Sequence, residues 1–188
     1  MLITKADKKT YFNLIQSQEN NKINHIFVFL EVFSREGGIQ SYVKDLFQAY
    51  STLSKQLRGE VFLLRDEKGC INPFESERLK FRYFRAKSSQ VGRAKMTLAL
   101  LKRLINEKPD HVFCGHAYLA PLVGTLCQPL GIPYTVITHG KEVWQPLPQL
   151  TKTSLQKASQ IWTVSRYTRE IASTNNILIL LVFKLLLV

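Results

Sequence analysis

The alternation of apolar, strand-like runs with helix-like runs is the feature of this sequence that most constrains its fold. Residues 23–33, INHIFVFLEVF, are rich in β-forming side chains and almost continuously apolar, which is typical of a strand buried on both faces of a parallel sheet. After Gly37 and Gly38, apolar residues recur at steps of three and four from Ile39 to Leu53. That spacing predicts a helix with one apolar stripe.

The same alternation continues along most of the chain. We predict further strands over residues 60–66, 79–85, 111–116, 134–140 and 160–165, and further helices over residues 91–110, 118–131, 150–159 and 166–174. Such a pattern predicts an α/β fold: a doubly wound, mostly parallel, Rossmann-like sheet with right-handed crossovers and helices on both faces. No internal repeat or low-complexity linker interrupts it, so we expect residues 23–176 to form one domain.

The two ends of the chain differ from this domain. Residues 1–22 are polar and lack the apolar stretch of a signal peptide, so we expect a partly disordered arm, with a short helix near residues 11–16, and a cytoplasmic protein. Residues 177–188, ILILLVFKLLLV, are apolar but shorter than the roughly 20 residues of a membrane-spanning helix. This tail is compatible with a buried strand or with an exposed, adhesive end.

Charge and cysteine content narrow the possible partners. The net charge of +12 favours phosphate-bearing partners, and a solvated basic face without a specific ligand is the alternative. The basic residues are scattered and accompany no nucleic-acid-binding motif, so no nucleic-acid partner is expected.

Cysteines at positions 70, 114 and 127 form no C-x-x-C pair, which argues against a disulfide framework or a metal site. We expect Cys114 and Cys127 to be buried thiols.

Polar residues follow several predicted strands at the point where each strand ends. Gly37 and Gly38 follow the first strand, His116 the fourth, His139 the fifth and Ser165 the sixth. Ligands of open parallel sheets bind outside the carboxyl ends of the strands. The sequence therefore predicts a ligand site on this edge of the sheet.

The two glycines have two interpretations. They either serve only to turn the chain into the next helix, or they let a phosphate approach the backbone where that helix begins. The pattern is neither G-x-G-x-x-G nor a P-loop, so it supports neither a dinucleotide site nor a Walker-type site.

The other polar residues also leave alternatives open. His116 and His139 are either satisfied residues at strand ends or groups that bind a sugar hydroxyl or phosphate, or transfer a proton. Glu142 either binds a hydroxyl or is a solvated loop charge. Arg166 and Arg169 either clamp a phosphate or form surface ion pairs.

Three segments in fixed order resemble a known enzyme family. GGIQSYVKDL, PDHVFCGHAYLAPLVGTLCQPLGIPYTVITHGKEVW and ASQIWTVSRYTREIA resemble the N-terminal half of the retaining, nucleotide-sugar-dependent glycosyltransferases of family 4. The resemblance covers about residues 24–177. It implies one half of a GT-B fold, in which two Rossmann-like domains face each other across a cleft.

The resemblance implies a role for each matching residue. His139 is implied to be the catalytic group near the reacting centre. A second set of residues is implied to bind substrate at the cleft: Gly37, Gly38, His116, Glu142, Ser165 and Arg169. The implied partners are a nucleotide-sugar donor and a sugar or lipid-linked acceptor. The donor is a substrate, so no cofactor and no metal are expected.

The sequence departs from the family after about residue 176. The family's second domain, which supplies donor-binding basic and acidic residues, is not recognisable, and we expect a truncation near Ile177. Such a fragment is expected to have little turnover, because catalysis needs preorganised groups from both walls of the cleft. The alternative is a non-catalytic module that binds an acceptor, or an anionic membrane surface, through its basic face.

Overall fold

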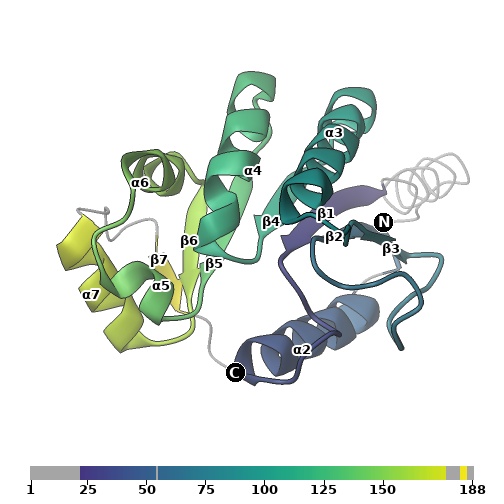
Figure 1. The fold of residues 1–188 in the computed structure, drawn as a ribbon, viewed down its shortest axis with the longest axis horizontal. Coiled ribbons are helices and arrows are strands. Elements are labelled where there is room, and N and C mark those ends of the chain that lie inside the picture. The colour runs from purple at the N-terminus through teal and green to yellow at the C-terminus, as the bar shows by residue number, and fades with distance from the viewer. Residues whose placement is uncertain (1–21, 54, 177–182, 186–188) are drawn as a thin grey trace, which may run out of the picture.

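A seven-stranded, entirely parallel sheet forms the centre of the protein (Figure 1). The computed structural model describes residues 22–53, 55–176 and 183–185. The strand order is β3-β2-β1-β4-β5-β6-β7, and its first six positions follow the order of a Rossmann fold. The strands are β1 (Ile23–Phe29), β2 (Leu57–Leu63), β3 (Leu79–Tyr83), β4 (His111–Cys114), β5 (Tyr134–Thr138), β6 (Gln160–Thr163) and β7 (Phe183–Leu185).

Helices cover both faces of this sheet, as Figure 1 shows for α2 on one side and α3 and α4 on the other. The α-helices are α2 (Gly38–Leu53), α3 (Ser89–Glu107), α4 (Ala120–Cys127), α5 (Lys141–Trp144), α6 (Gln149–Gln156) and α7 (Arg166–Asn176). Short 3₁₀ turns, η1 (Ala117–Leu119) and η2 (Gln128–Leu130), flank α4. The predicted α/β, doubly wound, parallel architecture is confirmed.

Strand β1 demonstrates why the first apolar run is almost continuous. Ile26 and Val28 pack into the hydrophobic cluster beneath α3, α4 and α6, whereas Phe27 and Phe29 pack into the cluster beneath α2. All four side chains are at most 2% exposed. A strand buried on both faces needs apolar side chains at successive positions, which is the pattern the sequence presents.

Several predicted elements have different boundaries in the structure. β1 ends at Phe29, not at residue 33, because the backbone of residues 32–34 bonds to a carboxylate instead of to a neighbouring strand. β2 begins at Leu57, earlier than predicted. The helix predicted over 118–131 is divided into η1, α4 and η2 and ends at Gly131, whose φ of 65° is left-handed.

The predicted buried thiols are confirmed. Cys114 and Cys127 are fully buried and free, and burial raises the pKa of each to about 12. Cys70 is also free and is partly exposed.

The terminal segments lie largely outside the described residues, including the polar arm and its predicted short helix. Within the apolar tail, the backbone of residues 183–185 forms β7, which pairs in parallel with β6. No helix of the described residues is long and apolar enough to cross a bilayer.

Candidate functional site

The carboxyl edge of the sheet carries a row of three connected hollows. The first, the histidine hollow, has a volume of about 470 Å³ and is lined by Gly38, Ile39, Tyr42 and His139, among others. The second, the bridging hollow, has a volume of about 180 Å³ and shares Ile39 with the first. These hollows bring together side chains that follow different strands, as the sequence predicts for this edge.

The His116 and His139 side chains meet at this edge, where β4 and β5 end. Their ring centroids are 6.1 Å apart. The His139 ring also lies 6.3 Å from the ring of Tyr42, which projects from α2. Burial raises the pKa of Tyr42 to about 12, so its hydroxyl keeps its proton at neutral pH. The two histidine rings and the Tyr42 ring therefore lie together at the carboxyl edge.

The hydrogen bonds of His139 define its tautomer. Its Nε2 lies 2.9 Å from the carbonyl oxygen of Gly115, which accepts hydrogen bonds and cannot donate them. Nε2 therefore carries the proton, and Nδ1 of the neutral ring is an acceptor. No hydrogen bond to Nδ1 is found among the described residues. The ring can accept a hydrogen bond from a ligand hydroxyl.

His116 has the complementary arrangement. Its Nδ1 accepts a hydrogen bond from the backbone N–H of Tyr118, at 3.2 Å, so the proton of the neutral ring is on Nε2. Burial lowers the pKa of His116; Glu142 opposes this shift, and His139 and Arg65 add to it. At neutral pH the ring is a neutral hydrogen-bond donor.

The structure bears on whether Gly37 and Gly38 only turn the chain into α2 or leave room for a ligand. Neither has a positive φ, and a Cβ placed on Gly38 would meet no atom within 4 Å. A Cβ on Gly37 would meet only the flexible Gln40 side chain. The backbone and packing therefore do not require glycine at Gly38, which begins α2 and lines the histidine hollow. Open space beside a helix N-terminus allows an anion to approach the free N–H groups.

Two residues predicted to bind substrate have structural partners instead. The Glu142 carboxylate accepts a hydrogen bond from the backbone N–H of His139 and so fixes the turn before α5. The Ser165 hydroxyl accepts from the backbone N–H of Thr168 at 3.1 Å, which caps the start of α7. Neither residue lines the histidine hollow or the bridging hollow.

The arginines of α7 lie apart from the histidine pair. Arg166 is exposed, and Arg169 is half-buried, with an Nε atom that has no hydrogen-bond partner among the described residues. Neither lines the hollows of the carboxyl edge. The structure thus brings together Gly38, His116 and His139 from the predicted set, and leaves Arg169 outside it.

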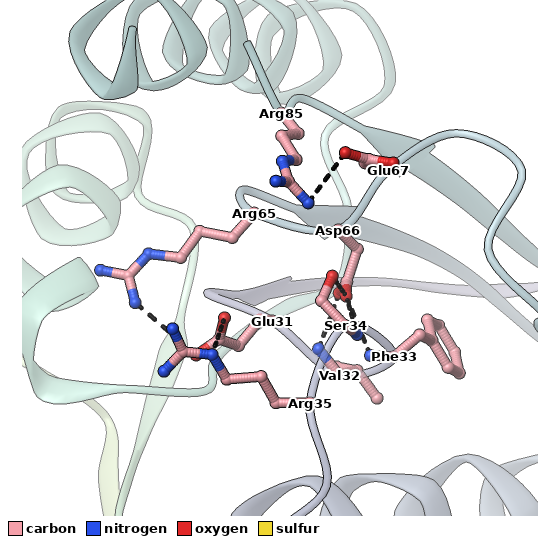
Figure 2. Close-up of polar contacts among 9 residues, drawn as sticks. All are labelled: Glu31, Val32, Phe33, Ser34, Arg35, Arg65, Asp66, Glu67 and Arg85. Carbon is pink, nitrogen blue, oxygen red and sulfur yellow. Dashed lines mark hydrogen bonds and ion pairs between the residues drawn. The ribbon is translucent and has the colours of Figure 1, made fainter. Parts of the chain in front are cut away.

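A buried carboxylate that the sequence analysis did not single out shapes the loop before the glycines (Figure 2). Asp66 is fully buried, and it accepts hydrogen bonds from the backbone N–H groups of Val32, Phe33 and Ser34, at 2.6–2.9 Å. The Ser34 hydroxyl also donates to it. An acidic residue at the end of an apolar predicted strand, as in LLRD, was the available signal for this role.

The third hollow of the row, the basic hollow, was not predicted from the sequence either. It has a volume of about 580 Å³ and is lined by five basic side chains: Arg35, Arg65, Arg85, Lys87 and Arg93. It shares Glu31 and Arg65 with the bridging hollow, so it continues the row. Basic residues at or just after the ends of the first three predicted strands were the signal for it.

Comparisons with solved structures identify the fold. The lipopolysaccharide outer core galactosyltransferase WaaB matches with a TM-score of 0.59 and 13% identity, over 86% of this chain and 44% of that one. HepE of Anabaena, in complex with UDP and glucose, matches with a TM-score of 0.58 and 11% identity, over 87% and 43%. The UDP-GlcNAc 2-epimerase of Methanocaldococcus jannaschii matches with a TM-score of 0.50 and 15% identity, over 87% and 45%.

These likenesses concern the fold, because all three identities are low. No protein-family model matches the sequence, and no curated protein matches it. The chain spans less than half the length of each of these neighbours. It therefore has the Rossmann-like α/β fold of about one half of a GT-B protein, a fold found in glycosyltransferases and in an epimerase.

Proposed function

We propose that this chain forms the N-terminal, acceptor-side domain of a retaining glycosyltransferase that uses a nucleotide-diphosphate sugar. The observation that carries the proposal is the histidine pair, 6.1 Å apart, beside the open N-terminus of α2. The fold shared with glycosyltransferases and the resemblance of the TVITHG and TVSRYT segments add support.

The chemistry of this pair suits a sugar. Each sugar hydroxyl donates one hydrogen bond and accepts others. With both rings in the neutral form, the pair offers one acceptor, Nδ1 of His139, and one donor, Nε2–H of His116. In the proposed role His139 contacts a hydroxyl of the reacting sugar and is the catalytic residue. His116 orients the sugar from the other side.

The start of α2 supplies the second part of the proposed site. Its free backbone N–H groups and the positive end of its dipole favour a negatively charged group. Its first turn contains no acidic residue to oppose that charge. We assign the donor diphosphate to this position, where the absence of a Cβ on Gly38 leaves space for it.

Turnover by the 188-residue chain alone is not expected. The described residues form one wall of the proposed cleft, and preorganised groups on both walls are needed to stabilise the transition state. We therefore expect the chain to bind substrates without transferring sugar.

Binding of UDP-glucose tests this proposal, since HepE is known in complex with UDP-glucose. Calorimetric titration of the chain should detect binding that His139→Ala weakens by about tenfold, a loss of about 1.4 kcal/mol. His25→Ala, at the amino edge of the sheet, is the control and should leave affinity unchanged. Absence of binding, or equal loss in both variants, would refute the proposal.

A non-catalytic module that binds an acceptor or an anionic membrane surface is the second candidate. The five basic side chains of the basic hollow favour it, because they would attract anionic groups without any reaction. Co-sedimentation with anionic vesicles that disappears at high salt, together with absent UDP-glucose binding, would support this candidate over the first.

A further inference from the structure

The basic hollow carries an excess of positive charge that the surrounding protein does not neutralise. Five basic side chains line it, and Glu31 is its one lining carboxylate. The Glu31 oxygens lie 3.9 Å from Arg35 Nε and 3.7 Å from Arg65 Nη1, beyond good hydrogen-bond distance. Both guanidinium groups approach this single acid (Figure 2). Their donors remain available to a further anion.

The remaining basic residues of the hollow are equally available. Arg85 contacts Glu67 at 2.9 Å, but both side chains are more than half exposed, so the pair contributes little. Lys87 and Arg93 have no ion pair within the described part of the chain. Like charges held around one cavity repel each other, and a bound anion removes that repulsion.

The positions of these side chains are set by rigid parts of the fold. Arg35, Arg65 and Arg85 each follow the carboxyl end of a different strand, β1, β2 and β3. Asp66 fixes the loop that precedes Arg35 through three backbone hydrogen bonds. The cations therefore converge through the fold, although they are distant in sequence.

Helix α3 completes the hollow on another side. Its residues Ser89, Gly92 and Arg93 line the cavity, so the N-terminal end of this helix faces it. The first turn contains no acidic residue. A Cβ on Gly92 would come within 2.7 Å of the Phe84 carbonyl oxygen, so α3 packs closely against the end of β3. The helix dipole adds to the positive potential of the five side chains.

The basic hollow lies next to the proposed sugar site without coinciding with it. Arg65 and Glu31 line both the basic hollow and the bridging hollow, which also contains His116. The histidine hollow shares no lining residue with the basic hollow. An anionic group in the basic hollow would thus lie on the side of the bridging hollow, outside the histidine hollow.

We propose that the basic hollow binds a phosphate or diphosphate group of the acceptor, so that the acceptor is a phosphorylated compound. That the bound phosphate belongs to the acceptor rests on the function proposed above, whereas the anion site itself is argued from the hollow alone. Arginine forks pair bidentately with the oxygens of phosphates, and five cations around one cavity favour a multiply charged phosphate over a single carboxylate. A volume of about 580 Å³ accommodates a diphosphate with part of the attached group.

Titration of inorganic pyrophosphate into the 188-residue chain, followed by calorimetry, tests the site. Arg93→Gln should weaken binding by about tenfold, as expected for the loss of one charge-assisted contact. Lys102→Gln removes the same charge from an exposed position further along α3, outside the hollow, and should leave affinity within about twofold. Equal losses in the two variants would overturn the proposal, because they would indicate unspecific attraction.

Two further arms distinguish the source of the phosphate. Glucose 1-phosphate represents a soluble acceptor, and phosphatidylcholine vesicles with or without phosphatidic acid represent a lipid-borne one. Binding in either arm that is weakened by Arg93→Gln and not by Lys102→Gln supports the site and identifies the source. If neither arm shows a difference between Arg93→Gln and Lys102→Gln, the proposal is overturned.

The same variants separate this inference from the proposed function. Arg93→Gln should leave UDP-glucose binding unchanged, because Arg93 does not line the histidine hollow. If Arg93→Gln does not weaken pyrophosphate binding while UDP-glucose still binds, the inference is refuted and the proposed function is not. An Arg93-dependent pyrophosphate site without UDP-glucose binding refutes the glycosyltransferase proposal alone.

Discussion

Replacement of Asp66 by alanine should cause a large loss of stability. This carboxylate is fully buried and accepts three backbone N–H groups and one hydroxyl from residues 32–34. Asp66→Ala leaves these donors without a partner, and each unsatisfied buried donor costs about 1–3 kcal/mol. Two of the backbone donors are only partly buried, so we expect a total loss of about 3–5 kcal/mol.

Urea denaturation followed by circular dichroism measures this loss. With an m-value of about 2 kcal/mol/M, a loss of about 4 kcal/mol lowers the midpoint by about 2 M. Such a loss is a large fraction of the 5–15 kcal/mol that stabilises a typical domain. Asp66→Asn keeps one acceptor oxygen and should give an intermediate value.

Glu67→Gln is the matched control for Asp66→Ala. It removes an acidic charge from the next residue, whose side chain is 64% exposed and pairs with Arg85 at the surface. Exposed pairs contribute about 0–1 kcal/mol, so its midpoint should remain close to that of the parent protein. Equal midpoints for Asp66→Ala and Glu67→Gln would refute the view that Asp66 holds the loop before the glycines.

Three further perturbations test other parts of the account. Gly38→Ala should leave stability unchanged or raise it by up to about 1 kcal/mol, since a Cβ there has open space, yet weaken UDP-glucose binding about tenfold in calorimetry. Gly115→Ala, whose Cβ would lie 1.9 Å from the Phe29 ring, should lower the free energy of unfolding by about 1–3 kcal/mol in urea titration. Burial, with a smaller contribution from a neighbouring histidine, lowers the pKa of His111 from 6.5 to about 4. The unfolded chain therefore binds a proton between these pH values that the folded protein does not, and urea midpoints should fall as pH is lowered from about 6.5 to about 4.

The fold was largely predictable because the strands are buried on both faces. The apolar run that forms β1 contributes to two separate hydrophobic clusters, and a pattern of that kind has few alternatives to a parallel sheet. Its carboxyl end was placed too late, because a contact with Asp66, distant in sequence, stops the strand. The four-residue helix α5 was missed, because it is too short to display a helical period.

The candidate site was only partly predictable. His116 and His139 meet because the carboxyl ends of adjacent parallel strands β4 and β5 share one edge, and this follows from topology alone. The backbone-capping roles of Glu142 and Ser165 depend on the exact course of nearby turns, which residue spacing does not determine. The convergence of basic residues after β1, β2 and β3 likewise required the strand order.

The four histidines give the most direct test of the central claim, that the carboxyl edge of the sheet binds the nucleotide sugar. His116 and His139 lie at that edge, whereas His25 and His111 face each other across β1 and β4 near the opposite edge. The Hε1 resonances of all four can be followed by NMR during titration with UDP-glucose. The account predicts saturable shifts for His139 and His116 and none for His25 and His111. Shifts confined to His25 and His111, or no shift in any of the four, would contradict it.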